Sequence, residues 1–206
     1  QDSSTRRAIR ERLQRQYPRS PHRVRVMEMK VVTLWEKQRY ADAFELLGRT
    51  QQLDPDSRVA CRLARHELPA DVFVGLCPCL AKTPDVTGLQ IRSPGLRSFD
   101  PIRSLPLRRL TARYLEVRDL TPLFDMPLSQ LDVGCNALTT LEPLRGMQLV
   151  RLSCSDNRIT GLEPLAGMPL VSLWVNGNLI TSLEPLAGMP LTGVMCDRNR
   201  ISSLAP

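Results

Sequence analysis

The stretch LSQLDVGCNALTTLEPLRGMQ, residues 128–148, recurs along the second half of the chain with few changes. It is followed directly by LVRLSCSDNRITGLEPLAGMP and then by LVSLWVNGNLITSLEPLAGMP. The copies of 21 residues begin at Val86, Leu107, Leu128, Leu149 and Leu170, with a partial copy from Leu191. Residues 86–206 therefore hold five full repeats and one partial repeat. A fixed period of this length indicates repeats that bury their apolar residues by stacking on one another.

The front half of each copy predicts a short strand. Its fourth and sixth residues are apolar and flank a residue of another kind, as in Leu131-Asp132-Val133. Such alternation is typical of a strand with one buried face. The ninth residue is an asparagine in four copies, and a buried amide must form hydrogen bonds. We therefore expect a structural ladder made of Asn136, Asn157, Asn178 and Asn199.

The back half of each copy reads T-x-L-E-P-L-x-G-M-P, which is too short for a long helix. Proline suits the first position of a helical turn and glycine suits its end. The prolines are Pro143, Pro164 and Pro185, and the glycines are Gly146, Gly167 and Gly188. This pattern predicts one 3₁₀ or single-turn α-helical segment in each copy.

The skeleton Leu-x-x-Leu-x-Leu-x-x-Asn-x-Leu resembles the leucine-rich repeat family. The repeat length and the L-x-P-L phrase are similar to the short repeats of internalin-like bacterial proteins. The longer phrase L-x-P-L-x-G-M-P-L resembles repeat arrays of planctomycete-type bacterial proteins, some of which are attached to serine/threonine kinases. The resemblance implies an α/β fold: a right-handed solenoid with a parallel sheet on its concave face and short 3₁₀ or helical turns on its convex face.

Residues 1–70 predict an α-helical segment that precedes the repeats. Apolar residues near helical spacing indicate a helix over residues 22–38, and helices are also expected over residues 1–20, 39–57 and 56–66. Residues 71–85 form a junction. We expect its apolar run VFVGLCPCL, together with the helices, to cap the first repeat, because an exposed end of a repeat array needs a cover.

The segment over about residues 22–55 also resembles a tetratricopeptide hairpin. Tyr40, Ala43, Leu47 and Pro55 fall where that family places its tyrosine, alanine, large apolar residue and proline. Val31 stands in place of the usual glycine and Thr50 in place of an alanine. A single hairpin is fewer than a self-standing array needs, so we expect a structural role for it.

Charge and cysteine usage narrow the functional classes. The formal net charge is +7, and residues 1–70 carry 15 Lys and Arg against 9 Asp and Glu. The acidic residues are interspersed, which favours a solvated helical surface over a nucleic-acid site.

Cys154 and Cys196 occupy the inward sixth repeat position, so we interpret them as small core residues rather than disulfide partners. This pattern favours a reducing compartment, the cytoplasm, although localisation stays unknown.

The ends of the chain limit what the sequence says about targeting. No stretch reaches the roughly 20 apolar residues that a membrane span needs. The chain begins at Gln1 rather than at a methionine, and it ends within a repeat at Pro206. We therefore expect it to be a fragment of a longer protein, and a missing leader carries no weight.

No catalytic constellation stands out in the sequence. There are 2 histidines and no phosphate-binding loop, nucleophile elbow or kinase signature. Cys77 and Cys79 are close together but have no partner pair for zinc, and Glu142, Glu163 and Glu184 form a column best read as a solvated edge. We therefore expect no enzyme activity, cofactor, metal or small-molecule substrate.

Binding of a protein partner on the concave face of the repeat array remains as the main expectation. The residues that vary between copies are those facing outward from the strands, and we predict a binding set of Arg109, Arg113, Tyr114, Asp132, Arg151, Trp174, Asn176 and Met195. Trp174 is read either as an interface anchor or as surface filler on Arg151 and Met195. Two alternatives are a sensor or scaffold region of a larger bacterial signalling protein, such as a serine/threonine kinase, and nucleic-acid binding by the basic helices.

Overall fold

The computed structural model describes residues 21–54, 60, 63, 68, 70–82, 86–93 and 95–202. The helix expected over residues 1–20 and most of the one expected over residues 56–66 lie outside them. The chain forms two compact units. One comprises Gln1–Leu63 with Pro78–Pro84, and the other, the repeat unit, comprises Ala64–Cys77 with Asp85–Pro206.

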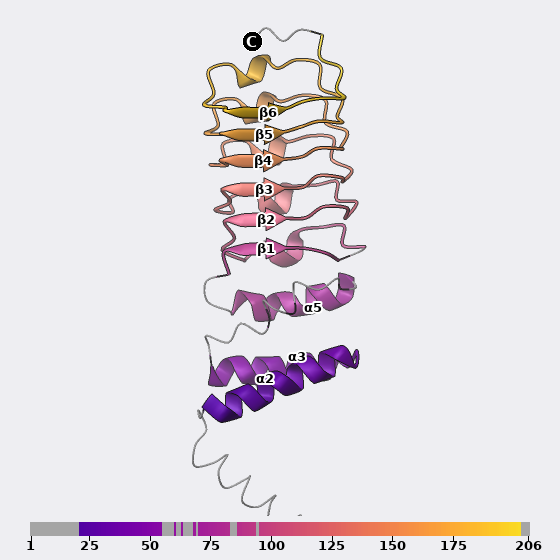
Figure 1. The fold of residues 1–206 in the computed structure, drawn as a ribbon, viewed down its shortest axis with the longest axis vertical. Coiled ribbons are helices and arrows are strands. Elements are labelled where there is room, and N and C mark those ends of the chain that lie inside the picture. The colour runs from indigo at the N-terminus through magenta and orange to yellow at the C-terminus, as the bar shows by residue number, and fades with distance from the viewer. Residues whose placement is uncertain are drawn as a thin grey trace, which may run out of the picture. The chain divides into compact units, whose positions relative to one another are not determined.

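Each copy of the repeat contributes one short strand to a parallel sheet. The strands are β1 (Gly88–Gln90), β2 (Arg109–Thr111), β3 (Gln130–Asp132), β4 (Arg151–Ser153), β5 (Ser172–Trp174) and β6 (Gly193–Met195). They pair in chain order, and equivalent positions of neighbouring copies lie opposite each other, as Leu131 does with Leu152. Figure 1 shows the six strands side by side. The predicted parallel sheet is thus confirmed.

The core of the repeat unit is a set of columns of apolar side chains. The fourth and sixth positions point inward, so Leu152, Cys154, Leu173 and Val175 are all fully buried. Burial of one such leucine side chain is worth roughly 1.5–3 kcal/mol, and it is the stack of copies that makes this burial available. Val194, at the fourth position of the last described copy, is still 40% exposed.

A 3₁₀ turn follows each of the first five strands, as the proline and glycine pattern predicts. The turns are η1 (Asp100–Ile102), η2 (Thr121–Leu123), η3 (Glu142–Leu144), η4 (Glu163–Leu165) and η5 (Glu184–Leu186), and each has a proline in its first two positions. Gly146, Gly167 and Gly188 follow three of them with φ between 72° and 77°. This left-handed conformation suits glycine, which has no Cβ to clash.

Two helices of the other unit lie where helices are expected, although the second ends at Leu53 rather than at residue 57. They are α2 (Pro21–Glu36) and α3 (Tyr40–Leu53). The Trp35 ring meets the rings of Tyr40 and Phe44 edge to face, at centroid distances of 5.2 and 5.7 Å. Val31, Ala43 and Leu47 are fully buried, so the amphipathic pattern correctly marks the packed faces.

The apolar run of the junction is itself a helix, α5 (Ala70–Ala81), which the sequence reading did not assign. Gly75 and Pro78 argue against a helix locally, yet the buried Val72, Phe73, Leu76 and Leu80 recur at helical spacing. Pro78 is exposed and lacks the N–H that would continue the hydrogen-bond ladder. No helix in the described part of the chain is long and apolar enough to cross a membrane.

The repeat unit also includes the segment that leads into α5. Leu68 N donates a hydrogen bond to Arg92 O at 3.0 Å, and Ser93 Oγ donates to Leu68 O at 2.6 Å. These bonds join Leu68 to the loop that follows β1. That the segment over residues 71–85 caps the first repeat stays a prediction.

Candidate binding face

One side of the sheet, here called the outward face, carries the third and fifth residues of each copy. Their side chains are exposed or half-buried, whereas the residue between them is buried in β1 to β5. The predicted binding residues Arg109, Asp132, Arg151, Trp174 and Met195 all lie on these strands. Arg113, Tyr114 and Asn176 come just after β2 and β5. The structure therefore places all eight on consecutive copies, β2 to β6 with their following turns.

Trp174 lies in the middle of a row across the last strands. Its direct neighbours in register are Ser153 on β4 and Met195 on β6, while Arg151 lies opposite Ser172. Trp174 is half-buried and Met195 is 54% exposed. Ser153 is small, so one flank of the Trp174 ring has a short neighbour and the other a long apolar one. Side chains of directly paired residues on neighbouring strands are the closest to each other. Arg151 is not directly paired with Trp174, so the expected contact between these two side chains is a diagonal one.

The first strands carry a basic patch, which consists of Arg92, Arg109 and Arg113. Arg109 Nε lies 3.6 Å from the place where a Cβ on Gly88 would stand, so its guanidinium lies over β1. Arg92 and Arg113 line a surface pocket of 380 Å³ together with Gln90, Thr111 and Tyr114. Arg92 was not in the predicted set, although it occupies the same repeat position as Arg113 and could have been found from that column.

Two different neighbours hold the Arg113 side chain. Its Nη2 lies 3.8 Å from Cys135 Sγ, and its Nε lies 3.9 Å from Asp132 Oδ1. The hydrogen bond with Cys135, and after it the charge of Asp132, raise the pKa of Arg113 above its usual value. The guanidinium also lies 5.4 Å from the Tyr114 ring centroid, in a cation–π arrangement. Arg113 is therefore a fixed positive group beside an aromatic ring that is 71% exposed.

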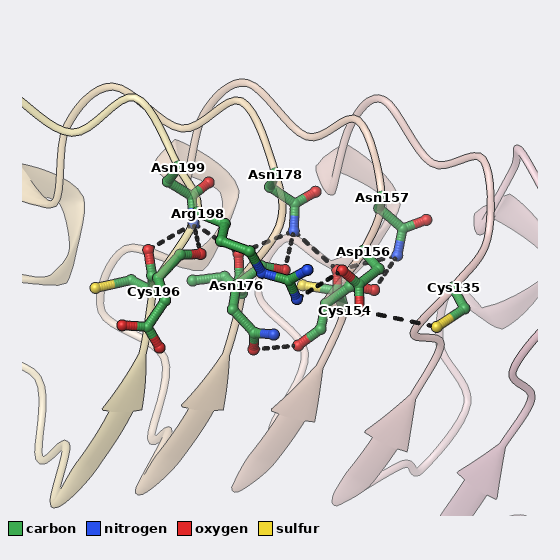
Figure 2. Close-up of polar contacts among 12 residues, drawn as sticks. Cys135, Cys154, Asp156, Asn157, Asn176, Asn178, Cys196, Arg198 and Asn199 are labelled. Atoms are coloured by element: carbon green, nitrogen blue, oxygen red, sulfur yellow. Dashed lines mark hydrogen bonds and ion pairs between the residues drawn. The ribbon is translucent and has the colours of Figure 1, made fainter.

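The turns that follow β3 to β6 carry a line of polar contacts, which Figure 2 shows. Ser155 Oγ donates to Asn176 Oδ1 at 2.7 Å, and Arg198 Nη2 donates to Asp156 Oδ1 at 3.0 Å. Asn176, one of the predicted binding residues, thus has its side-chain oxygen engaged within the repeat unit. The Asp156–Arg198 pair was not foreseen, because the two residues are two copies apart in the sequence.

The asparagines at the ninth position bond the turns of adjacent copies together (Figure 2). Asn157 Nδ2 donates to Val133 O of the preceding copy at 3.1 Å and to Cys154 O of its own copy at 2.9 Å. Its Oδ1 accepts a hydrogen bond from Leu138 N at 3.0 Å. Asn136, Asn178 and Asn199 make the equivalent bonds. Their polar atoms are committed to the backbone and leave little for a ligand.

Asn136 also bonds the preceding copy, which has no asparagine at its own ninth position. That copy has Leu115 at the ninth position, and its turn carries two N–H groups that need partners. Asn136 Oδ1 accepts from both Leu115 N and Val117 N, each at 3.1 Å. The bond from Val117 N is the regular ladder bond, and the bond from Leu115 N is an additional one.

Residues suited to metal binding do not gather in the part of the chain that the structure describes. No group of three His, Cys, Asp or Glu side chains comes together there. Glu142, Glu163 and Glu184 are exposed, and Glu142 binds Arg145 through bonds of 2.7 and 2.9 Å that lower the pKa of its carboxyl. Among the described cysteines, Cys135, Cys154 and Cys196 take part in no disulfide.

Comparisons with known proteins agree with this architecture. No family model matches the chain, and no curated protein sequence matches it. Among solved structures, internalin C2 from Listeria monocytogenes strain 4b F2365 is similar, with a TM-score of 0.53 and 26% sequence identity. The match covers 57% of this chain and 54% of that chain, so the two share about half of their lengths. It does not confirm the tetratricopeptide resemblance. The chain is thus a parallel six-stranded sheet with 3₁₀ turns and N-terminal helices, similar in fold to internalin C2, a leucine-rich repeat protein.

Proposed function

We propose that the chain is a non-catalytic protein-interaction module that binds its partner on the outward face of the sheet, the concave face of a right-handed leucine-rich repeat solenoid. The observation that carries this proposal is the Trp174–Met195 pair, two large apolar side chains in register on the solvent side of the sheet. Water contact with such side chains is unfavourable, and tryptophan is enriched among the residues that dominate binding energy at interfaces.

The surroundings of the pair also suit a protein partner. On β4 the direct neighbour of Trp174 is the short polar Ser153, and the charged Arg151 lies diagonal to the ring, opposite Ser172. An apolar centre with a polar margin is the usual arrangement of a protein interface. The internalin C2 likeness supports the scaffold, while the binding role rests on these side chains.

Selection of random peptides on the immobilised chain tests this proposal. Dissociation constants of the selected peptides are then measured for the wild type, Trp174→Ala and the matched control Phe124→Ala. Phe124 is a large aromatic residue that is 56% exposed beside η2, so it controls for loss of an exposed ring. We expect Trp174→Ala to weaken the peptides and Phe124→Ala to leave them unchanged. Equal binding by all three proteins would refute the proposal.

A further inference from the structure

Charge is distributed unevenly along the outward face. The outward positions of β1 and β2 and the residues two places after these strands are Gly88, Gln90, Arg92, Arg109, Thr111 and Arg113, and none is acidic. Arg113 Nε lies 3.9 Å from the carboxylate of Asp132 on β3. The apolar pair Trp174 and Met195 lies on β5 and β6. The face thus has a basic end and an apolar end, separated by the strands between them.

The positive charge of Arg92 is not neutralised within the described residues. In the amide orientation that satisfies both groups, Gln90 accepts hydrogen bonds from Arg92 Nε at 3.2 Å and Nη2 at 3.1 Å. The amide is neutral, so it orients the guanidinium without cancelling its charge. Arg92 and Arg113 both line the 380 Å³ pocket, together with Ile91, Tyr114 and Leu115. Two guanidinium groups at one pocket suit a carboxylate, which can accept hydrogen bonds from both.

We propose that the outward face recognises a short extended segment of a protein partner at two points, an acidic side chain in the Arg92–Arg113 pocket and a large apolar side chain on Trp174 and Met195. This rests on the proposed function, because it assigns the chemistry of the partner that binds the same face. The positive charge of Arg92 and Arg113 favours an acidic side chain of the partner, and the apolar Trp174 and Met195 favour a large apolar side chain of the partner.

The spacing of the strands sets the distance between the two groups. Arg113 follows β2 and Trp174 lies on β5, three strand steps away. Neighbouring strands are about 4.8 Å apart, so with the offset along the strands the two points are about 15 Å apart. An extended peptide advances about 3.3 Å per residue, so about four or five residue steps separate the acidic from the apolar side chain. A shorter spacing cannot span the two points, and a longer one spans them only if the peptide bends.

Synthetic peptides with one glutamate and one leucine, separated by serine spacers of increasing length, test the proposal. Each has a matched peptide with glutamine in place of glutamate. We expect the Glu peptide of about four or five residue steps to bind about fivefold tighter than its Gln counterpart, as paired surface charges allow. We also expect this preference to fall at high salt, because exposed charges are screened.

Paired variants locate the effect on the chain. The double variant Arg92→Gln, Arg113→Gln should lose the Glu preference. The control Arg118→Gln, Arg158→Gln removes the same charge from exposed residues beyond the outward face and should keep it. The double variant Arg92→Glu, Arg113→Glu should reverse the preference toward a lysine peptide. Equal binding of Glu and Gln peptides by the wild type would overturn the proposal, as would a single-stranded oligouridylate that outcompetes every peptide through Arg92 and Arg113.

The two proposals fail in different ways. If glutamate brings no preference but Trp174→Ala still weakens the selected peptides, the acidic subsite is wrong and the binding face stands. If Trp174→Ala has no effect on any peptide, the binding face itself is refuted and the subsite with it.

Discussion

The carboxylate of Asp156 accepts a hydrogen bond from Arg198 Nη2 at 3.0 Å, although the two residues belong to copies that are not neighbours. The residue at the same position of the copy between them is Gly177, with φ +68°. A Cβ on Gly177 would occupy the space of the Asp156 carboxylate. The glycine therefore serves two purposes: it adopts the left-handed conformation without strain, and it leaves room for an ion pair that spans three copies (Figure 2).

The first prediction concerns this glycine. Gly177→Ala introduces left-handed strain of roughly 1–2 kcal/mol and also displaces the Asp156 carboxylate. The matched control Gly188→Ala has nearly the same φ, +73°, and no atom within 4 Å of the added Cβ. We expect urea unfolding to show a larger loss of stability for Gly177→Ala. The Asp156–Arg198 pair is largely exposed, so the excess should be about 1 kcal/mol or less. Equal losses would show that the carboxylate moves aside freely.

A second prediction compares two adjacent residues of β5 that face opposite sides. Leu173 is fully buried in the core column, so Leu173→Ala should lower the free energy of unfolding by about 2–5 kcal/mol. Trp174 is on the outward face and half-buried, so Trp174→Ala should cost about 1 kcal/mol or less. The partner affinity should change in the opposite order, with about 2 kcal/mol lost at Trp174. Equilibrium unfolding and peptide titration of both variants provide the check, and a Trp174→Ala variant that unfolds would contradict the register.

The third prediction concerns the asparagine ladder. Asn157→Ala leaves Leu138 N without its side-chain partner inside the repeat unit, whereas Val133 O and Cys154 O keep the bonds from Asn136 and Asn178. Each buried polar group without a partner costs roughly 1–3 kcal/mol, so thermal unfolding should show a drop of several degrees. Asn199→Ala removes the same kind of bonds in the last described copy, where the side chain is only half-buried and water can replace it. We expect a clearly smaller drop there, and similar drops would mean that burial does not set the cost.

The parallel sheet and the 3₁₀ turns of the repeat unit could be predicted from the sequence because the same residue pattern recurs in each copy. The inward leucines, the proline of each 3₁₀ turn and the asparagine at the ninth position depend on local spacing and on contacts with the next identical copy. Helix α5 was missed for the opposite reason. Its Gly75 and Pro78 disfavour a helix locally, and only the burial of Phe73 and Leu76 in the folded chain outweighs them.

The conformation of the eighth repeat position was not predictable from residue type. Tyr114, Cys135, Asp156 and Arg198 share no chemistry, yet all have φ between 53° and 61°. The shared cause is the stack, since the N–H of Cys135, Asp156 and Gly177 each donates 2.8 Å bonds to the carbonyl of the seventh residue of the next copy. Side-chain contacts across copies, such as Arg113 with Cys135, follow from that turn geometry. They cannot be predicted by comparing the residues at one repeat position.

The last prediction uses two cysteines at the same repeat position. Burial raises the pKa of the Cys154 thiol to about 12, with a further contribution from Asp132. Alkylation requires the thiolate, so native Cys154 should resist iodoacetamide at about pH 8. Cys196 occupies the sixth position of the last described copy and is half-buried, so it should be modified faster. Mass spectrometry of peptides from the native and urea-unfolded chain measures both rates. The unfolded chain should label the two cysteines alike, because an ordinary cysteine ionises near pH 8.5. Native Cys154 that reacts as fast as Cys196 would show that the stack opens around β4 at least as readily as at its end.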